Sequence, residues 1–457
     1  MLKEIWSALG QPNEFLGHVS NVGEGDLSSV YAVTDLAVAS ISAATLSMAH
    51  LIAQRQDCVP AVQIDRVLAS RWFSRSIQPI GWELPPTWDS VAGDYETHDG
   101  WIKLHTNAPH HRAAALRALG LSVTDHRVSR QDVAQVVRTI KANDLEQEIV
   151  LQGGCAAEMR TVEAWAHHPQ GIAVQAEPLL GVRDYDVGTA CAKWSLNPDR
   201  PLKGIRVLDL TRILAGPVAT RYLASYGAEV LRIDPLDWDE PVVAPEITLG
   251  KRRARLDLRS PSGKKSFETL LRNTDVLVHG YRSDALEKLG LGEQRRRELN
   301  PSLIDVSLDA YGWTGPWHAR RGFDSLVQMS TGFAEAGMRI LGKAIPTPLP
   351  VQALDHATGY MLAASVIRGL VRRITDGGGS SVHASLARTA AMLNQASPPY
   401  AREIVSLREE LMSDYANDME ATPWGPARRL LPAYSIKNTN AYWDLPAGRL
   451  GDGVPAW

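Results

Sequence analysis

The stretch PLKGIRVLDLTRILAGPVATRYLASYGAEVLRID, residues 201–234, decides the fold of this chain. It begins with an apolar run at 204–210, which is followed by a turn containing one glycine and one proline. A helix-forming segment at 216–226 comes next, and a second apolar run at 230–234 closes the stretch. Short apolar runs separated by a helical segment predict a strand, a helix and a second strand.

The same alternation continues after this stretch. Ser260 and Pro261 are typical of a helix start, and short apolar runs follow at 276–278 and 303–306. Strands that alternate with helices predict an α/β fold, with a parallel sheet flanked by helices. Ligands of such sheets bind beyond the carboxyl ends of the strands, where the loops present backbone amides.

The first 200 residues have a different pattern. A long apolar segment at 31–55 predicts a helix, and residues 99–103 (DGWIK) predict a turn that leads into a strand. Further helices are expected at 111–119, 130–142 and 155–166. This part of the chain is therefore expected to form a smaller α+β domain.

Composition and local motifs exclude several classes of protein. The net charge of -3 does not indicate the strongly basic surface that nucleic-acid-binding proteins usually have. Cys58, Cys155 and Cys191 lie too far apart for a disulfide framework or a CxxC metal site. The adjacent pairs His110-His111 and His167-His168 lack the spacing of helical metal ligands, so no metal is expected.

The sequence contains no segment that predicts membrane insertion. The first ten residues, MLKEIWSALG, lack the cationic start and apolar run of a signal peptide. The longest weakly polar run, at 36–52, is interpreted as a buried helix because it is shorter than a membrane span and contains His50. We therefore expect a cytoplasmic protein.

Two segments of the chain resemble each other at an offset of 320 residues. Asp35, Ala37, Ala43 and Ala44 align with Asp355, Ala357, Ala363 and Ala364. Both segments lead into a short strand candidate, at 61–64 and at 381–384. These matches indicate a partial internal repeat.

A dinucleotide site is the first alternative that the 201–234 stretch suggests. Its turn, Thr211 to Pro217, holds one glycine where the GxGxxG fingerprint has three. The missing glycines would have supplied the tight turn, the close approach to pyrophosphate and the helix packing. NAD binding is therefore not expected.

Five sequence motifs follow this stretch along the chain, and their order is that of a known family. They are GKRRARLDLRSPSGKK (250–265), DVLVHGYRSDALEKLG (275–290), NPSLIDVSLDAYGWTGP (300–316), GFDSLVQMSTGF (322–333) and LDHATGYMLAASVIRGL (354–370). Over residues 201–388 the chain resembles the family III CoA-transferases, the formyl-CoA transferase and carnitine dehydratase group. The resemblance implies a Rossmann-like large domain, transfer of CoA from an acyl-CoA to a small carboxylic acid, no tightly bound cofactor, and a homodimer.

The resemblance also implies a nucleophile, Asp355, at the start of a long helix. An aspartate with its ordinary pKa of about 3.9 is ionised at pH 7 and needs no partner base. Its attack on a thioester would give a mixed anhydride and then an aspartyl-CoA thioester, both of which must be kept from water. Gly359, one turn later, would leave room for the thioester. The structural alternative is that Asp355 only caps its helix.

Other family positions that contact CoA carry over to this chain. They are Leu214, Ala215, Leu256, Arg259, Tyr281, Arg282, Lys288 and Arg321. Several cations around an apolar slot suit the phosphates of CoA. The chain departs from the family pattern at His279-Gly280, at Pro235 and at the 376–380 turn.

Two alternatives share the same fold. An acyl-CoA racemase would need a histidine where Phe323 stands, and phenylalanine cannot transfer a proton. A non-catalytic CoA-binding protein would tolerate the departures from the pattern. A scaffold that binds no CoA is the third possibility.

The repeat and the resemblance together suggest a fused chain. We expect a degenerate partial copy of the large domain at 1–75, a small α+β domain at 76–190, a linker at 191–202, the CoA-binding domain at 203–400 and a C-terminal segment at 401–457 that returns to the large domain. Asp35 is then a vestige of the nucleophile, because Ala39 replaces the glycine found at 359.

Overall fold

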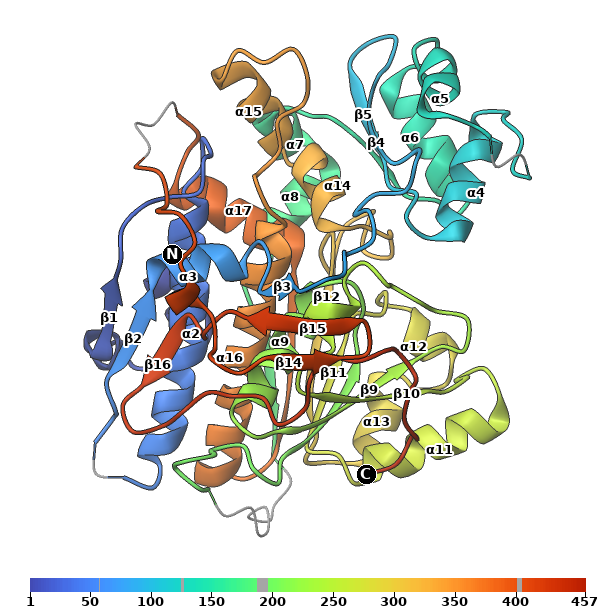
Figure 1. Cartoon of the computed structure of the whole chain (residues 1–457). Helices are drawn as coiled ribbons and strands as arrows, with labels where there is room; N and C mark the ends of the chain where they lie inside the picture. Colours follow the sequence, from blue (N-terminus) through green and yellow to red (C-terminus); the bar gives the residue numbers. More distant parts are fainter. Residues whose placement is uncertain (57, 125–126, 187–195, 401–404) are drawn as a thin grey trace.

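A seven-stranded sheet forms the centre of the protein in the computed structural model, which describes residues 1–56, 58–124, 127–186, 196–400 and 405–457 (Figure 1). The strand order is β10-β9-β8-β11-β12-β13-β7; the first six strands are parallel and β7 is antiparallel. The strands are β7 (Gly181–Tyr185), β8 (Arg206–Leu210), β9 (Glu229–Asp234), β10 (Lys251–Arg255), β11 (Val276–His279), β12 (Ile304–Asp309) and β13 (Gly379–Ser385). The predicted parallel α/β sheet is confirmed.

Alternate residues of β8, in the middle of the sheet, enter two different cores. On β8, Val207 belongs to the core that includes α9 (Ala215–Ser225) and α16 (Ala353–Thr375). Its neighbour Leu208 belongs to the core under α11 (Pro261–Arg272). Helices therefore cover both faces, as a parallel sheet requires.

The helix predicted to begin at Ser260 and Pro261 shows why these residues mark its start. The Ser260 side chain accepts a hydrogen bond from the Gly263 backbone N–H, and Pro261 occupies the first turn, where a missing N–H costs nothing. Phe267 and Leu270 then face the core.

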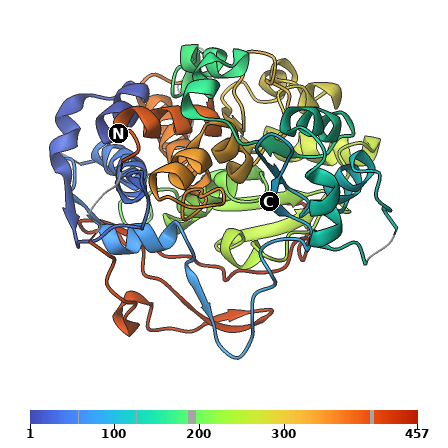
Figure 2. The same cartoon turned by 90° about the horizontal axis from the view of Figure 1, so that it is seen from above.

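A smaller α+β unit stands to one side of the large sheet (Figure 1). Strands β4 (Gly93–Glu96), β5 (Trp101–Leu104) and β6 (Ala156–Glu158) form an antiparallel sheet. Helices α4 (Pro109–Ala118), α5 (Arg130–Val137) and α6 (Ala142–Leu151) pack on it around a core of their own. Seen from above, this unit (teal) lies at the opposite end of the molecule from the N-terminal helices (blue) (Figure 2).

The helix predicted at 155–166 is wrong. Ala156 pairs with Leu104 as part of β6, and α7 (Val162–His167) begins only later. The open edge of β5 supplies backbone partners and buries Ala156 and Ala157, so sheet pairing overrides the helix propensity of these alanines. Residues 191–195 of the predicted linker (191–202) lie outside the described residues, which resume at 196.

The internal repeat has a structural counterpart. Helix α2 (Val33–Ala53), strand β2 (Val62–Asp65) and helix α3 (Arg66–Trp72) follow one another as do α16, β13 and α17 (Leu386–Ala396). Helix α2 packs side by side with α16, and the two share one apolar core (Figure 1). Helix α2 is long and apolar enough to cross a bilayer, but 89% of its most apolar window is buried inside the protein.

The C-terminal segment joins the N-terminal and central parts. Strand β16 (Tyr434–Ile436) pairs with β2, while β14 (Glu420–Thr422) and β15 (Gly425–Arg429) form a sheet with β3 (Ile77–Pro79). The last residues then run beside the large sheet, where the Trp457 indole N–H donates to the Leu270 carbonyl.

Candidate active site

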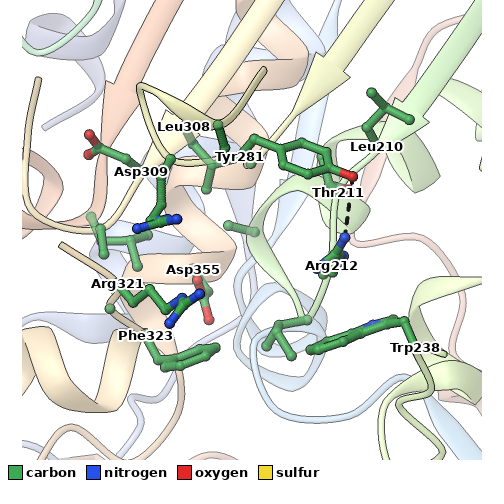
Figure 3. A pocket seen from close by; sticks show the side chains of 18 of the residues that line it. Leu210, Thr211, Arg212, Trp238, Tyr281, Leu308, Asp309, Arg321, Phe323 and Asp355 are labelled. Atoms are coloured by element: carbon green, nitrogen blue, oxygen red, sulfur yellow. Dashed lines mark hydrogen bonds between the residues drawn. The ribbon is translucent and has the colours of Figure 1, made fainter. Parts of the chain in front are cut away.

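A cavity of about 480 Å³ opens at the carboxyl ends of β8, β9, β11 and β12 (Figure 3). Leu210, Gly280 and Asp309 line it from the strand ends. His110 and His111 of α4 line it from the small unit. The cavity therefore lies where ligands of parallel sheets bind, between the two units of the chain.

Hydrogen bonds to buried charged residues fix the loop that follows β8. Asp209 accepts hydrogen bonds from the Thr211 backbone and hydroxyl and from Lys251 Nζ at 2.9 Å. Burial lowers the pKa of Lys251 to about 8, against the opposing pull of Asp209. Ile213 has a φ of 63°, an unfavourable value for a β-branched residue, and its N–H donates to Glu240. This network fixes a strained loop at the cavity wall.

Asp355 lies at the floor of the cavity. It is the third residue of α16, whose N-cap position is Gln352, so the helix-capping alternative for Asp355 is wrong. The residue is 7% exposed, and its backbone N–H donates to Asp324 Oδ2 at 2.9 Å. Among the described residues, no cation lies within ion-pair distance of its carboxyl group.

The carboxyl group of Asp355 does not have its ordinary acidity. Burial, and next the negative charge of Asp324, raises the pKa of Asp355 well above its usual value. Burial also raises the pKa of Asp324, to about 6. The expectation of an unperturbed carboxylate is therefore wrong, because the sequence did not show that these two acids are buried together.

Three arginines of the cavity have no carboxylate partner among the described residues: Arg212, Arg282 and Arg321. The Arg212 guanidinium lies over the Trp238 ring at 4.7 Å and donates to the Tyr281 hydroxyl at 3.2 Å. In Figure 3, Arg212 lies on one side of the cavity, and Arg321 lies with Asp355 on the other. Unpaired guanidinium groups are suited to phosphate and carboxylate ligands.

The predicted site residues fall into two groups. Asp355, Ala215, Tyr281, Arg282 and Arg321 line the cavity, whereas Leu214, Leu256, Arg259, Lys288 and Gly359 do not. Arg259 and Lys288 are 68% and 71% exposed and pair with Asp257 and Asp284. Leu214 and Leu256 pack against the apolar cores instead.

Gly359 has a different role from the one expected. A Cβ atom there would collide with the Ala215 carbonyl oxygen and lie 2.9 Å from Val218 Cβ. The glycine therefore lets α16 approach the first turn of α9, and the space is filled by backbone rather than left for a thioester.

Sequence reasoning missed several lining residues, among them Arg212, Trp238, His111 and Leu386. Arg212 could have been predicted, because it is a cation in the turn after the first strand of the 201–234 stretch. The other three residues come from distant segments. His111 is buried, and neither of its ring nitrogens has a hydrogen-bond partner among the described residues. Burial lowers its pKa to about 3, so the ring is neutral.

The ring at the racemase position, Phe323, and the histidine next to Asp355 both stack on other aromatic rings. Phe323 stacks on His105 with ring centroids 3.8 Å apart, and His356 stacks on Phe73, outside the cavity lining. Within the described ranges, no group of three or more His, Cys, Asp or Glu side chains could hold a metal ion.

These features define an α/β protein with a cavity that arginines line beside a buried carboxyl group. The family model of CoA-transferase family III matches residues 202–421 of this chain.

The chain is also similar to individual members. An acyl-CoA transferase of Gibberella moniliformis is 29% identical over 332 residues, which are 68% of this chain and 58% of that protein. A probable fatty acyl-CoA transferase of Mycobacterium tuberculosis is 35% identical over 40% of this chain and 49% of its own length. A crystal structure of the mycobacterial protein covers 44% of this chain and 57% of that chain at 33% identity, with a TM-score of 0.39. The chain spans about half the length of these curated relatives.

The burial of Asp355 predicts a change of stability in Asp355→Asn. Because its pKa is raised, the folded protein holds this proton more tightly than the unfolded chain does. That stabilisation is complete below about pH 3.9 and is lost as the pH rises through the raised pKa. Asp355→Asn should therefore be more stable than the wild type at pH 8, by about 0.5–2 kcal/mol. Urea unfolding at pH 8 and pH 3.5 measures this, and an equal gain at both pH values would contradict it.

The close approach at Gly359 predicts that Gly359→Ala is destabilised. The added methyl group must displace the Ala215 carbonyl, at a cost of about 1–3 kcal/mol. Thermal unfolding measures the loss, and a wild-type melting temperature would show that the helices have room.

Proposed function

We propose that this chain transfers CoA from an acyl-CoA donor to a carboxylic acid, with Asp355 as the nucleophile. One observation carries the proposal: a buried carboxyl group lies on the floor of a cavity, and among the described residues neither it nor Arg212, Arg282 and Arg321 of the lining has an ion-pair partner. The names of the relatives support the same reaction class.

The reaction would begin with Asp355 in its ionised form. One carboxylate oxygen attacks the thioester carbonyl, a C–O bond forms, the C–S bond breaks, and CoA leaves as a thiolate. The thiolate then attacks the aspartyl carbonyl of the mixed anhydride, which gives an aspartyl-CoA thioester and releases the first acid. The acceptor acid repeats these steps in reverse.

The surroundings of Asp355 suit this chemistry. A carboxylate with a raised pKa is more basic, and therefore more nucleophilic, once it is ionised. Its burial limits the access of water to both hydrolysable intermediates. Arg212 and Arg282 would bind the phosphates of CoA, and Arg321, on the side of Asp355 in Figure 3, would bind an acid.

A second candidate is a protein that binds acyl-CoA without turnover. The family position occupied by His279 favours it, because this side chain is buried next to Asp305 and does not line the cavity. The two candidates differ in whether Asp355 becomes acylated.

Acylation is tested by mass spectrometry after incubation with an acyl-CoA panel and hydroxylamine. Transfer predicts a hydroxamate on Asp355 and none in Asp355→Asn. Asp35→Asn is the matched control, and it should label Asp355 like the wild type. If CoA binds by calorimetry but Asp355 stays unlabelled across the panel, the chain is a binding protein and the proposal fails.

The pKa of Asp355 predicts how activity depends on pH. Activity should fall on the acid side as Asp355 becomes protonated. Asp324→Asn removes a negative charge, which lowers the pKa of Asp355, so the acid limb of the kcat/KM profile should move to lower pH. An unchanged limb would mean that another group controls the profile.

A further inference from the structure

The two copies of the repeat have the same backbone at the start of their long helices. Helices α2 and α16 begin at Val33 and Ala353, which are 320 residues apart. The preceding residues have φ and ψ of -79° and 63° in one copy and -76° and 65° in the other. In both turns the first helical N–H donates to the carbonyl two residues before it, at 2.9 and 2.8 Å. Asp35 and Asp355 therefore occupy equivalent backbone positions.

The strands extend this equivalence. Strand β2 lies between β1 (Val19–Val22), which is parallel to it, and β16, which is antiparallel. Strand β13 lies in the same way between β12 and β7. A helix follows each central strand directly, beginning at Arg66 in one copy and at Leu386 in the other. These two residues are also 320 apart, so Arg66 is the counterpart of Leu386.

The difference between Arg66 and Leu386 changes the charge available to the aspartate of each copy. Arg66 Nη1 donates to Asp35 Oδ1 at 2.7 Å, and the same guanidinium also bonds Asp26 and the Gly25 carbonyl. The Asp35 side chain is 45% exposed. Leu386 lines the same cavity as Asp355 and offers no charge. The first copy has an aspartate held in an ion pair, and among the described residues the second has one without.

The charges that face Asp355 come from every surrounding element, and within the described residues none forms an ion pair with it. Helix α14 (Asp324–Ser330) contributes Asp324, β12 contributes Asp309, and the loop before α14 contributes Arg321. The β8–α9 loop contributes Arg212, and α4 contributes the neutral His111. Arg320 of the same cavity is paired with Glu146. By the equivalence of positions 66 and 386, we expect a cation at position 386 to reach Asp355 as Arg66 reaches Asp35.

We propose that Leu386 is a positioning residue of this active site: it keeps the aspartate of the second copy unpaired and reactive, while Arg66 silences the aspartate of the first copy. This inference rests on the proposed function. The attacking lone pair of Asp355 must form the C–O bond as the C–S bond breaks, and a guanidinium would occupy that lone pair. The chain would then hold one reactive site, although it contains two copies of the nucleophile helix.

The test compares Leu386→Arg with two neutral variants, Leu386→Met and Leu386→Gln. Hydroxylamine labelling of Asp355 with an acyl-CoA is followed as a rate from pH 5 to pH 9. Leu386→Arg should lower the rate by about 100-fold or more and move its acid limb to lower pH, because a paired carboxylate is harder to protonate and to release. Leu386→Met and Leu386→Gln should keep the acid limb of the wild type. Equal losses in the Arg and Gln variants would overturn the proposal, since bulk or polarity and not charge would then be responsible.

Arg66→Leu is the reciprocal variant, and it does not alter the cavity. It should leave the labelling of Asp355 unchanged and increase the modification of Asp35 by carbodiimide and glycine ethyl ester several-fold. An unchanged Asp35 would overturn the silencing role of Arg66, even if Leu386→Arg does not fold. If the wild-type protein labels and Leu386→Arg labels equally well, only the role of Leu386 fails. If no acyl-CoA labels the wild type, the proposed function itself fails.

Discussion

A carboxyl group that is buried without a counter-ion among the described residues is the constraint on which the site depends. Burial of a charge is unfavourable unless it is paired, and the negative charge of Asp324 makes ionisation of Asp355 still less favourable. The fold must therefore hold it in place by packing. The apolar core shared by α2, α9 and α16 supplies that packing, and Gly359 lets α16 reach the Ala215 carbonyl. Stability is therefore given up at the position of Asp355.

In contrast to Asp355, the buried charges that support the cavity wall are paired. Beneath the β8–α9 loop, buried charges are paired: Asp209 with Lys251, and Arg232 with Asp234 and Glu240. These pairs hold the loop in a strained conformation, as the φ of Ile213 shows. Inside the cavity, Arg212, Arg282 and Arg321 have no carboxylate partner in the described part of the chain. Paired charges shape the site, and unpaired charges remain available to a ligand.

The N-terminal part, in which α2, β2 and α3 follow the same order as α16, β13 and α17, contributes structure to this arrangement. Helix α2 buries most of its residues against α16 and the segments around it, which supports the helix that bears Asp355. The ion pair between Arg66 and Asp35 lies at a half-exposed position, where the charge of the aspartate is balanced. Helix α2 thus supports the structure, whereas α16 carries the aspartate of the cavity.

The sequence by itself determined the sheet, because apolar runs and helical segments alternate and because Ser260 and Pro261 act through local backbone chemistry. It also indicated the repeat, and it singled out Asp355 through a resemblance. Sequence reasoning failed at Ala156, where pairing with β5 outweighs local propensity, and at Gly359, whose contact lies on another helix. The lining residues His111, Trp238 and Leu386 come from segments far apart in the chain, so only tertiary structure brings them together. The acidity of Asp355 was decided in the same way, because desolvation and the charge of Asp324 depend on packing in space and not on the order of residues.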